Sequence, residues 1–172
     1  LWAMIETCRA MFALNEIGAA SADLGVTVWV MGSNDLAKEM RCALTVDRAP
    51  LMTALTLSLM AARAHGVAIL DGVFNDIADG EGFERQCTQA VQWGFDGKTL
   101  IHPGQIDGAN RAFTPEPDAV AWARRIVAAF DDPEARDKGV LKVEGRMVER
   151  LHLAEAKRLI AVDDAILARE AS

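Results

Sequence analysis

Short hydrophobic runs of strand character alternate along the first hundred residues with longer stretches of helical periodicity. The strand-like runs cover residues 1–6, 26–31, 67–70 and 99–101, and the helical stretches cover residues 9–24, 33–40, 50–65 and 82–93. Periods of two and of about four residues distinguish the two kinds of element. Strands that alternate with helices at this spacing predict an α/β fold in which parallel strands are joined by helical crossovers.

The pattern changes after Pro103. A helix is predicted at residues 118–130, a short strand or hairpin at 139–145, and an amphipathic helix at 148–169. We therefore predict one domain at residues 1–113 and a helical extension at residues 114–172. Four strand–helix units cannot close an eight-stranded barrel, and an open sheet would leave two edges to protect. The expected fold is the carboxyl-terminal half of a TIM (β/α)8 barrel, with part of the barrel missing.

Composition favours a cytoplasmic enzyme. The chain has 172 residues, of which 51% are hydrophobic, and this suits a domain with a real core. The net charge of −7 and the dispersed lysines and arginines argue against nucleic acid as a partner. No apolar run is long enough to span a bilayer, so no membrane contact is expected. Three cysteines without metal-type spacing indicate reduced thiols in a reducing compartment.

Two carboxylates stand at matching places behind consecutive strands. Glu6 closes the first strand-like run, and Asp35 follows the second. Parallel strands place their carboxyl ends at one edge, where barrel folds keep their chemistry. Magnesium prefers a few carboxylates together with water and substrate oxygens, so this pair predicts a divalent metal site. The alternative is that both are loop acids that cap the following helix.

Three further residues are candidates for the same pocket. Asp71 ends the third strand and is predicted to line the pocket as a catalytic residue, or else to anchor a turn. Lys98 and His102 flank the fourth strand and are predicted to face a phosphate-bearing ligand, the alternative being a buried histidine satisfied by backbone. The fragment at residues 97–99 is not a phosphate-binding loop, because the first glycine of that motif would fall at Gln92.

Five segments together resemble the citrate lyase beta-subunit-like CoA-ester lyases, which include malyl-CoA lyases and malyl-CoA thioesterases. They are MIET at 4–7, MGSNDLAK at 31–38, AARAHG at 61–66, LDGV at 70–73 and GFDGKTLIHP at 94–103. The resemblance implies a magnesium-dependent barrel, with Mn²⁺ able to replace Mg²⁺, in which Glu6 and Asp35 are the metal ligands. It also implies a missing upstream half that carries a substrate-binding arginine.

The tail resembles the carboxyl-terminal lid of the same family, in which an aspartate acts across a subunit interface. The matching stretch is GRMVERLH at 145–152, where Glu149 replaces the aspartate. The resemblance implies a catalytic acid–base role for Glu149 and a homotrimer or hexamer. The alternative is an ordinary acid at the start of a helix.

Three functions follow from the resemblance. The first is a lyase that cleaves or forms a 3-hydroxyacyl-CoA such as malyl-CoA, giving glyoxylate and acetyl-CoA. The second is a (3S)-malyl-CoA thioesterase, and the third is a non-catalytic subunit or inactive fragment. In the first two the partners are an acyl-CoA, with CoA as part of the substrate, and a small 2-oxo acid. The sequence does not identify the acyl group.

Overall fold

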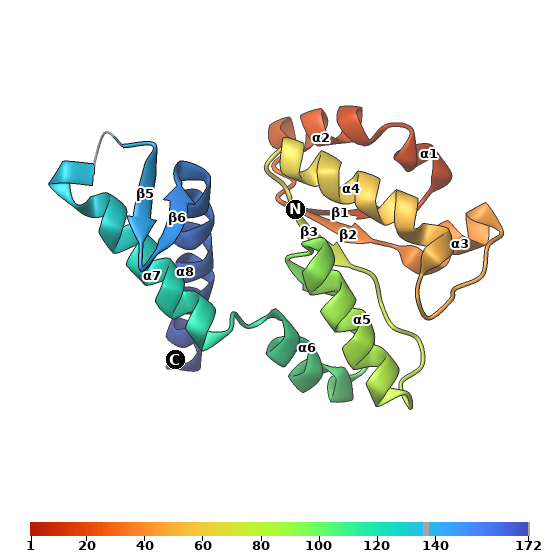
Figure 1. Ribbon diagram of the computed structural model, residues 1–172. Helices are drawn as coiled ribbons and strands as arrows, with labels where there is room; N and C mark the ends of the chain where they lie inside the picture. The colour runs from red at the N-terminus through yellow and green to blue at the C-terminus, as the bar shows by residue number, and fades with distance from the viewer. Residues whose placement is uncertain (136–137, 172) are drawn as a thin grey trace. The chain divides into compact units, whose positions relative to one another are not determined.

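The computed structural model describes residues 1–135 and 138–171 (Figure 1). The chain forms two compact units, Leu1–Phe113 and Thr114–Ser172.

The first unit is built on a four-stranded parallel sheet in the order β1-β2-β3-β4. Its strands are β1 (Trp2–Ile5), β2 (Val28–Met31), β3 (Ala68–Asp71) and β4 (Gly97–Lys98). The parallel α/β arrangement predicted from the sequence is confirmed. The fourth strand lies two residues earlier than predicted, because it pairs with the last two residues of β3, and the chain then turns into a 3₁₀ helix.

Helices connect these strands. They are α1 (Cys8–Met11), α2 (Leu14–Asp23), α3 (Ser33–Met40), α4 (Met52–Ala64), α5 (Gly80–Trp93) and α6 (Ile106–Phe113), with 3₁₀ turns η1 (Ala49–Leu51) and η2 (Pro103–Gln105). The helix predicted at residues 9–24 is two helices. The amides of Phe12 and Ala13 bond to carbonyls three residues back, which ends α1 before α2 begins. In Figure 1, α2 and α4 lie side by side, and the two helices are in contact.

The core of this unit lies between the sheet and its helices. Strand residues Ile5, Trp29 and Ile69 are at most 1% exposed and pack with apolar residues of α2 and α4. Successive strand side chains point to opposite faces. Accordingly, Trp2 and Met4 are 62% and 53% exposed. The same alternation decides which face each candidate site residue occupies.

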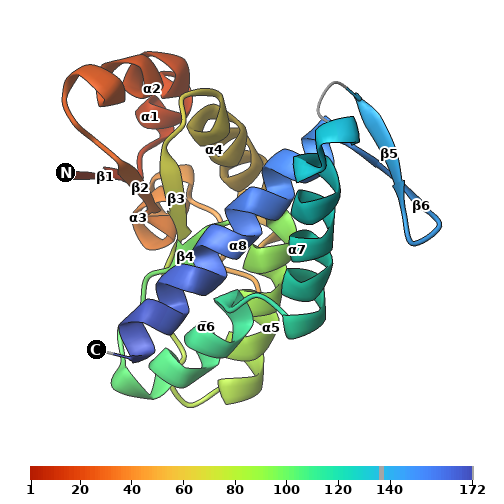
Figure 2. The ribbon, with the colours of Figure 1, turned by 90° about the vertical axis from the view of Figure 1, so that its left-hand side faces the viewer.

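The second unit is a helical hairpin with a small sheet. Helix α7 (Pro117–Asp131) is followed by η3 (Pro133–Ala135), an antiparallel hairpin of β5 (Val140–Val143) and β6 (Arg146–Glu149), and α8 (Arg150–Glu170). Of the two predicted options at this point, the hairpin is confirmed. Figure 2 shows α7 and α8 running in opposite directions. Their core consists of Ala123, Ile126, Phe130, Val143, Val148 and Ala156. In the described part of the chain, every helix is too short or too polar to cross a membrane.

Candidate functional site

Glu6 and Asp35 lie behind neighbouring strands at the carboxyl edge of the sheet. Ile5 and Met31 are register partners, and the amide of Gly32 donates to the Ile5 carbonyl at 3.0 Å. A Cβ atom on Gly32 would overlap the Glu6 side chain and lie 2.6 Å from its Oε2 atom. Glycine at this position therefore leaves room for the Glu6 carboxylate. Asp35 follows in the first turn of α3.

Carboxylates are ligands that a divalent cation prefers, and Glu6 and Asp35 are the candidates here. Within the described residues, neither of them accepts a hydrogen bond or joins an ion pair. Neither acid occupies an N-cap position: the N-cap residue of α1, which follows Glu6, is Thr7, and that of α3 is Gly32. Among the described residues no three His, Cys, Asp or Glu side chains converge. The protein would thus offer two carboxylates and leave the other positions to water and substrate, which suits Mg²⁺.

Asp71 stands instead in a buried ion-pair network under α5. Its Oδ1 atom lies 2.6 Å from Arg48 Nη1, and its Oδ2 atom lies 2.8 Å from Lys98 Nζ. Lys98 also donates to the Gly72 carbonyl at 2.5 Å and to Gln86 Oε1 at 2.6 Å. The side chains of Asp71 and Lys98 are fully buried, and that of Arg48 is 5% exposed.

This placement bears on two expectations, and the catalytic role of Asp71 and the ligand-binding role of Lys98 stay predictions. Asp71 shares the helix-covered face with Ile69, whereas Glu6 continues the opposite face after Met4, so the alternation of strand side chains directs Asp71 and Glu6 to opposite faces of the sheet. Lys98 uses all three ammonium hydrogens within the protein, and so it presents no free cation to a phosphate. Burial lowers the pKa of Lys98, although the Asp71 carboxylate opposes that shift.

Arg48 is the member of this network that sequence reasoning missed. It lies in the loop before α4 with a left-handed backbone, φ 56°. Its Nε atom donates to Gln89 Oε1 at 2.8 Å, and its guanidinium carbon lies 4.9 Å from the centre of the Trp93 ring. The loop at residues 41–48 mixes polar and hydrophobic residues without a regular period, so no sequence signal separates this arginine from an exposed one.

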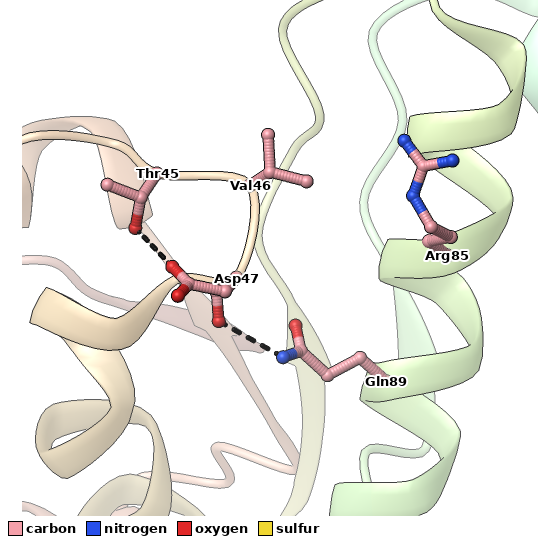
Figure 3. A pocket seen from close by; sticks show the side chains of 5 residues that line it. All are labelled: Thr45, Val46, Asp47, Arg85 and Gln89. Carbon is pink, nitrogen blue, oxygen red and sulfur yellow. Dashed lines mark hydrogen bonds between the residues drawn. The ribbon is translucent and has the colours of Figure 1, made fainter.

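Helix α5 also contacts the loop that carries Arg48. Figure 3 shows a surface hollow between this loop and α5, where Gln89 reaches across to the loop. The Gln89 amide donates to the Asp47 carbonyl at 3.1 Å, and Thr45 donates to the Asp47 carboxylate at 2.6 Å. The same glutamine therefore fixes both Asp47 and the neighbouring Arg48.

A smaller cavity of about 210 Å³ lies between this loop, the start of α3 and the segment after β3. Two of its lining residues, Asn34 and Asn75, exchange amide hydrogen bonds of 3.0 and 2.8 Å. Asn34 directly precedes Asp35. The amide pair thus ties the segment after β3 to the turn that carries one of the two proposed metal ligands.

His102 is exposed, not buried, and its Nδ1 atom accepts a hydrogen bond from the Gly104 amide at 3.0 Å. It is the N-cap residue of η2. The observed contact is a local cap, and a ligand-binding role for His102 stays a prediction.

Glu149 is the N-cap residue of α8. Its carboxylate accepts the backbone amide of His152, and the Glu149 amide donates to His152 Nδ1 at 2.9 Å. This reciprocal capping box agrees with the alternative of an acid at a helix start. Because Glu149 belongs to the second unit, its catalytic role stays a prediction.

The parallel sheet with acids at its carboxyl edge is characteristic of TIM-barrel-like α/β proteins of the citrate lyase beta type. A magnesium, acetoacetate and coenzyme A complex of CitE from Mycobacterium tuberculosis superimposes with a TM-score of 0.74 at 30% identity, over 94% of this chain and 60% of that one. A citrate lyase from Burkholderia xenovorans, at 18% identity, has the same fold with a TM-score of 0.78 over 96% of this chain and 53% of that one.

Residues 1–103 match the HpcH/HpaI aldolase/citrate lyase family model, and the chain belongs to this family. It is 45% identical over all 172 residues to a (3S)-malyl-CoA thioesterase of Cereibacter sphaeroides, of which it spans 59%. It is 32% identical to the citrate lyase beta subunit of Leuconostoc mesenteroides, over 96% of this chain and 54% of that protein. The family resemblance predicted from the sequence is confirmed.

Proposed function

We propose that this chain is part of a magnesium-dependent enzyme that hydrolyses (3S)-malyl-CoA to malate and CoA. The observation that carries the proposal is the 45% identity with the Cereibacter thioesterase across the whole chain. This favours the thioesterase, the second of the functions predicted from the sequence, over the lyase. The Glu6 and Asp35 carboxylates have no hydrogen-bond or ion-pair partner among residues 1–135 and 138–171, and this supports a metal site in the same enzyme.

The proposed fold of the complete enzyme is a TIM barrel of which residues 1–113 form the second half. The exposed Trp2 and Met4 side chains support this, since they would face the interior of a closed barrel. Residues 114–172 are proposed to be the lid. The trimeric or hexameric state and the cytoplasmic location remain predictions.

Glu6 and Asp35 would hold Mg²⁺, with Mn²⁺ as a substitute. When bound there, the ion would supply Lewis-acid polarisation of substrate oxygens. Hydrolysis requires that water adds to the thioester carbonyl, that the bond from acyl carbon to sulfur breaks, and that a proton of the water reaches the leaving sulfur. Glu149 is our candidate for carrying that proton, because a carboxylate can accept it from water and release it to the thiolate.

The lyase remains a second candidate. A malyl-CoA/beta-methylmalyl-CoA lyase of the same organism is 40% identical over 100 residues, which are 58% of this chain and 31% of that protein. In that reaction a base takes the proton of the malyl hydroxyl, the carbon–carbon bond breaks, glyoxylate leaves, and Glu149 would protonate the acetyl-CoA enolate carbon.

The products separate the two reactions. Full-length protein is incubated with malyl-CoA and Mg²⁺ while free thiol and glyoxylate are followed together. We expect thiol without glyoxylate. Glyoxylate without thiol would show that the enzyme is the lyase and not the thioesterase. If neither product forms, both assignments are contradicted.

A further inference from the structure

We infer that Lys98 is a positioning residue for the metal site: buried under α5, it fixes the end of β3 against the helix turn that carries Asp35. The inference rests on the proposed metal site of the preceding section. It assigns Lys98 a role in metal affinity without contact to metal or CoA.

The first link joins Lys98 to the end of β3. Lys98 and Asp71 are register partners in the last position of their strands, and their side chains form an ion pair of 2.8 Å. The Lys98 ammonium also holds the Gly72 carbonyl at 2.5 Å. Gln86 accepts its third hydrogen, so the lysine is fixed on three sides. The Lys98 side chain therefore fixes the backbone that follows β3 from the helix-covered face of the sheet.

The second link joins the end of β3 to α3. A Cβ atom on Gly72 would overlap the Ser33 hydroxyl and lie 2.8 Å from the Met31 carbonyl. The absence of a side chain thus lets β3 approach the first residue of α3 closely. Three residues further on, Asn75 is tied to Asn34 by their paired amide bonds. Both contacts hold the first turn of α3, in which Asp35 lies.

Residues that orient metal ligands without touching the metal typically change metal affinity by about 10- to 100-fold when they are replaced. Lys98→Met would remove the anchor of Gly72 while Asp71 keeps Arg48 as its partner. Asp35 would then lose its fixed position relative to Glu6. Metal affinity should fall even where the protein stays folded.

The chain offers a matched control at the opposite end of the same strands. Arg63 bonds to both carboxylate oxygens of Asp96 and to the Gly94 carbonyl, and Asp96 accepts the Ile69 amide. Arg63→Met therefore loosens the helix–sheet contact near the amino ends of β3 and β4, away from Glu6 and Asp35. It should lower stability and leave metal affinity unchanged.

The experiment measures Mn²⁺ affinity of the full-length protein by the loss of the free-ion EPR signal, below the unfolding temperature of each variant. We expect Lys98→Met to bind Mn²⁺ about 10-fold or more weakly, and Arg63→Met to stay within about twofold of wild type. Wild-type affinity in Lys98→Met would overturn the inference and leave the metal site intact. Absence of Mn²⁺ binding by the wild type would overturn the metal site as well.

Asn75→Ala tests the second link should Lys98→Met fail to fold. Its side chain is exposed, so the substitution leaves the core untouched. We expect weaker Mn²⁺ binding than in the wild type with little change in unfolding temperature. Unchanged Mn²⁺ affinity in Asn75→Ala would count against the inference.

Discussion

Arg48 Nη1 lies 2.6 Å from Asp71 Oδ1, although the two residues are 23 positions apart and both side chains are almost entirely inaccessible. Lys98 binds the other oxygen of the same carboxylate, so Asp71 is the only anion among three buried charges of this network. Through its two cationic partners, the buried Asp71 carboxylate links the loop before α4 to strands β3 and β4.

Asp71→Asn should therefore destabilise the protein strongly. The substitution leaves two buried cations without a counter-charge, and breaking a buried pair in this way costs about 3–5 kcal/mol. The free energy of unfolding is measured with urea. Glu84→Gln is the control, because its ion pair with Arg111 is 62% to 67% exposed and is expected to contribute less than about 1 kcal/mol. Equal losses for the two variants would contradict a bracing role for Asp71.

The buried lysine predicts how stability depends on pH. Burial lowers the pKa of Lys98 below its ordinary value of 10.5, so between the two values the unfolded chain binds more protons than the folded one. The free energy of unfolding contributed by this group therefore rises with pH across that window. Subtracting the pH profile of Lys98→Met from that of the wild type isolates the effect. A difference that falls as the pH approaches 10.5 would contradict the lowered pKa.

Two substitutions of Glu149 separate its observed cap from its proposed proton transfer. Glu149→Gln keeps an oxygen for the His152 amide, so we expect stability within about 0.5 kcal/mol of wild type and a loss of turnover of about 100-fold or more. Glu149→Ala should lose about 1 kcal/mol of stability in addition. Unfolding curves and turnover of malyl-CoA are measured for both. Full activity in Glu149→Gln would show that Glu149 serves only as a helix cap.

The sequence pattern predicted the parallel order of strands and helices because buried strands and amphipathic helices have different periods. It also placed Glu6 and Asp35 behind adjacent strands, as the structure has them. It misplaced the fourth strand, since a two-residue strand is defined by its partner and has no period of its own.

The roles of Asp71 and Lys98 depended on tertiary packing. Both residues end strands and Glu6 directly follows one, but a strand of only two to four residues has too short a pattern to show which face of the sheet a side chain occupies. Arg48 was missed for a related reason. Its burial comes from Gln89 and Trp93 on α5, about forty residues away in the sequence.

Glu6 and Asp35 are proposed to hold the catalytic metal. The most direct measurement is malyl-CoA turnover by the full-length protein as Mg²⁺ is titrated, for wild type, Glu6→Gln and Asp35→Asn, with the exposed Glu16→Gln on α2 as the matched control. We expect Mg²⁺-dependent turnover in wild type and Glu16→Gln, and a loss of about 100-fold or more in the other two. Turnover that survives either Glu6→Gln or Asp35→Asn at wild-type Mg²⁺ concentrations would contradict the site.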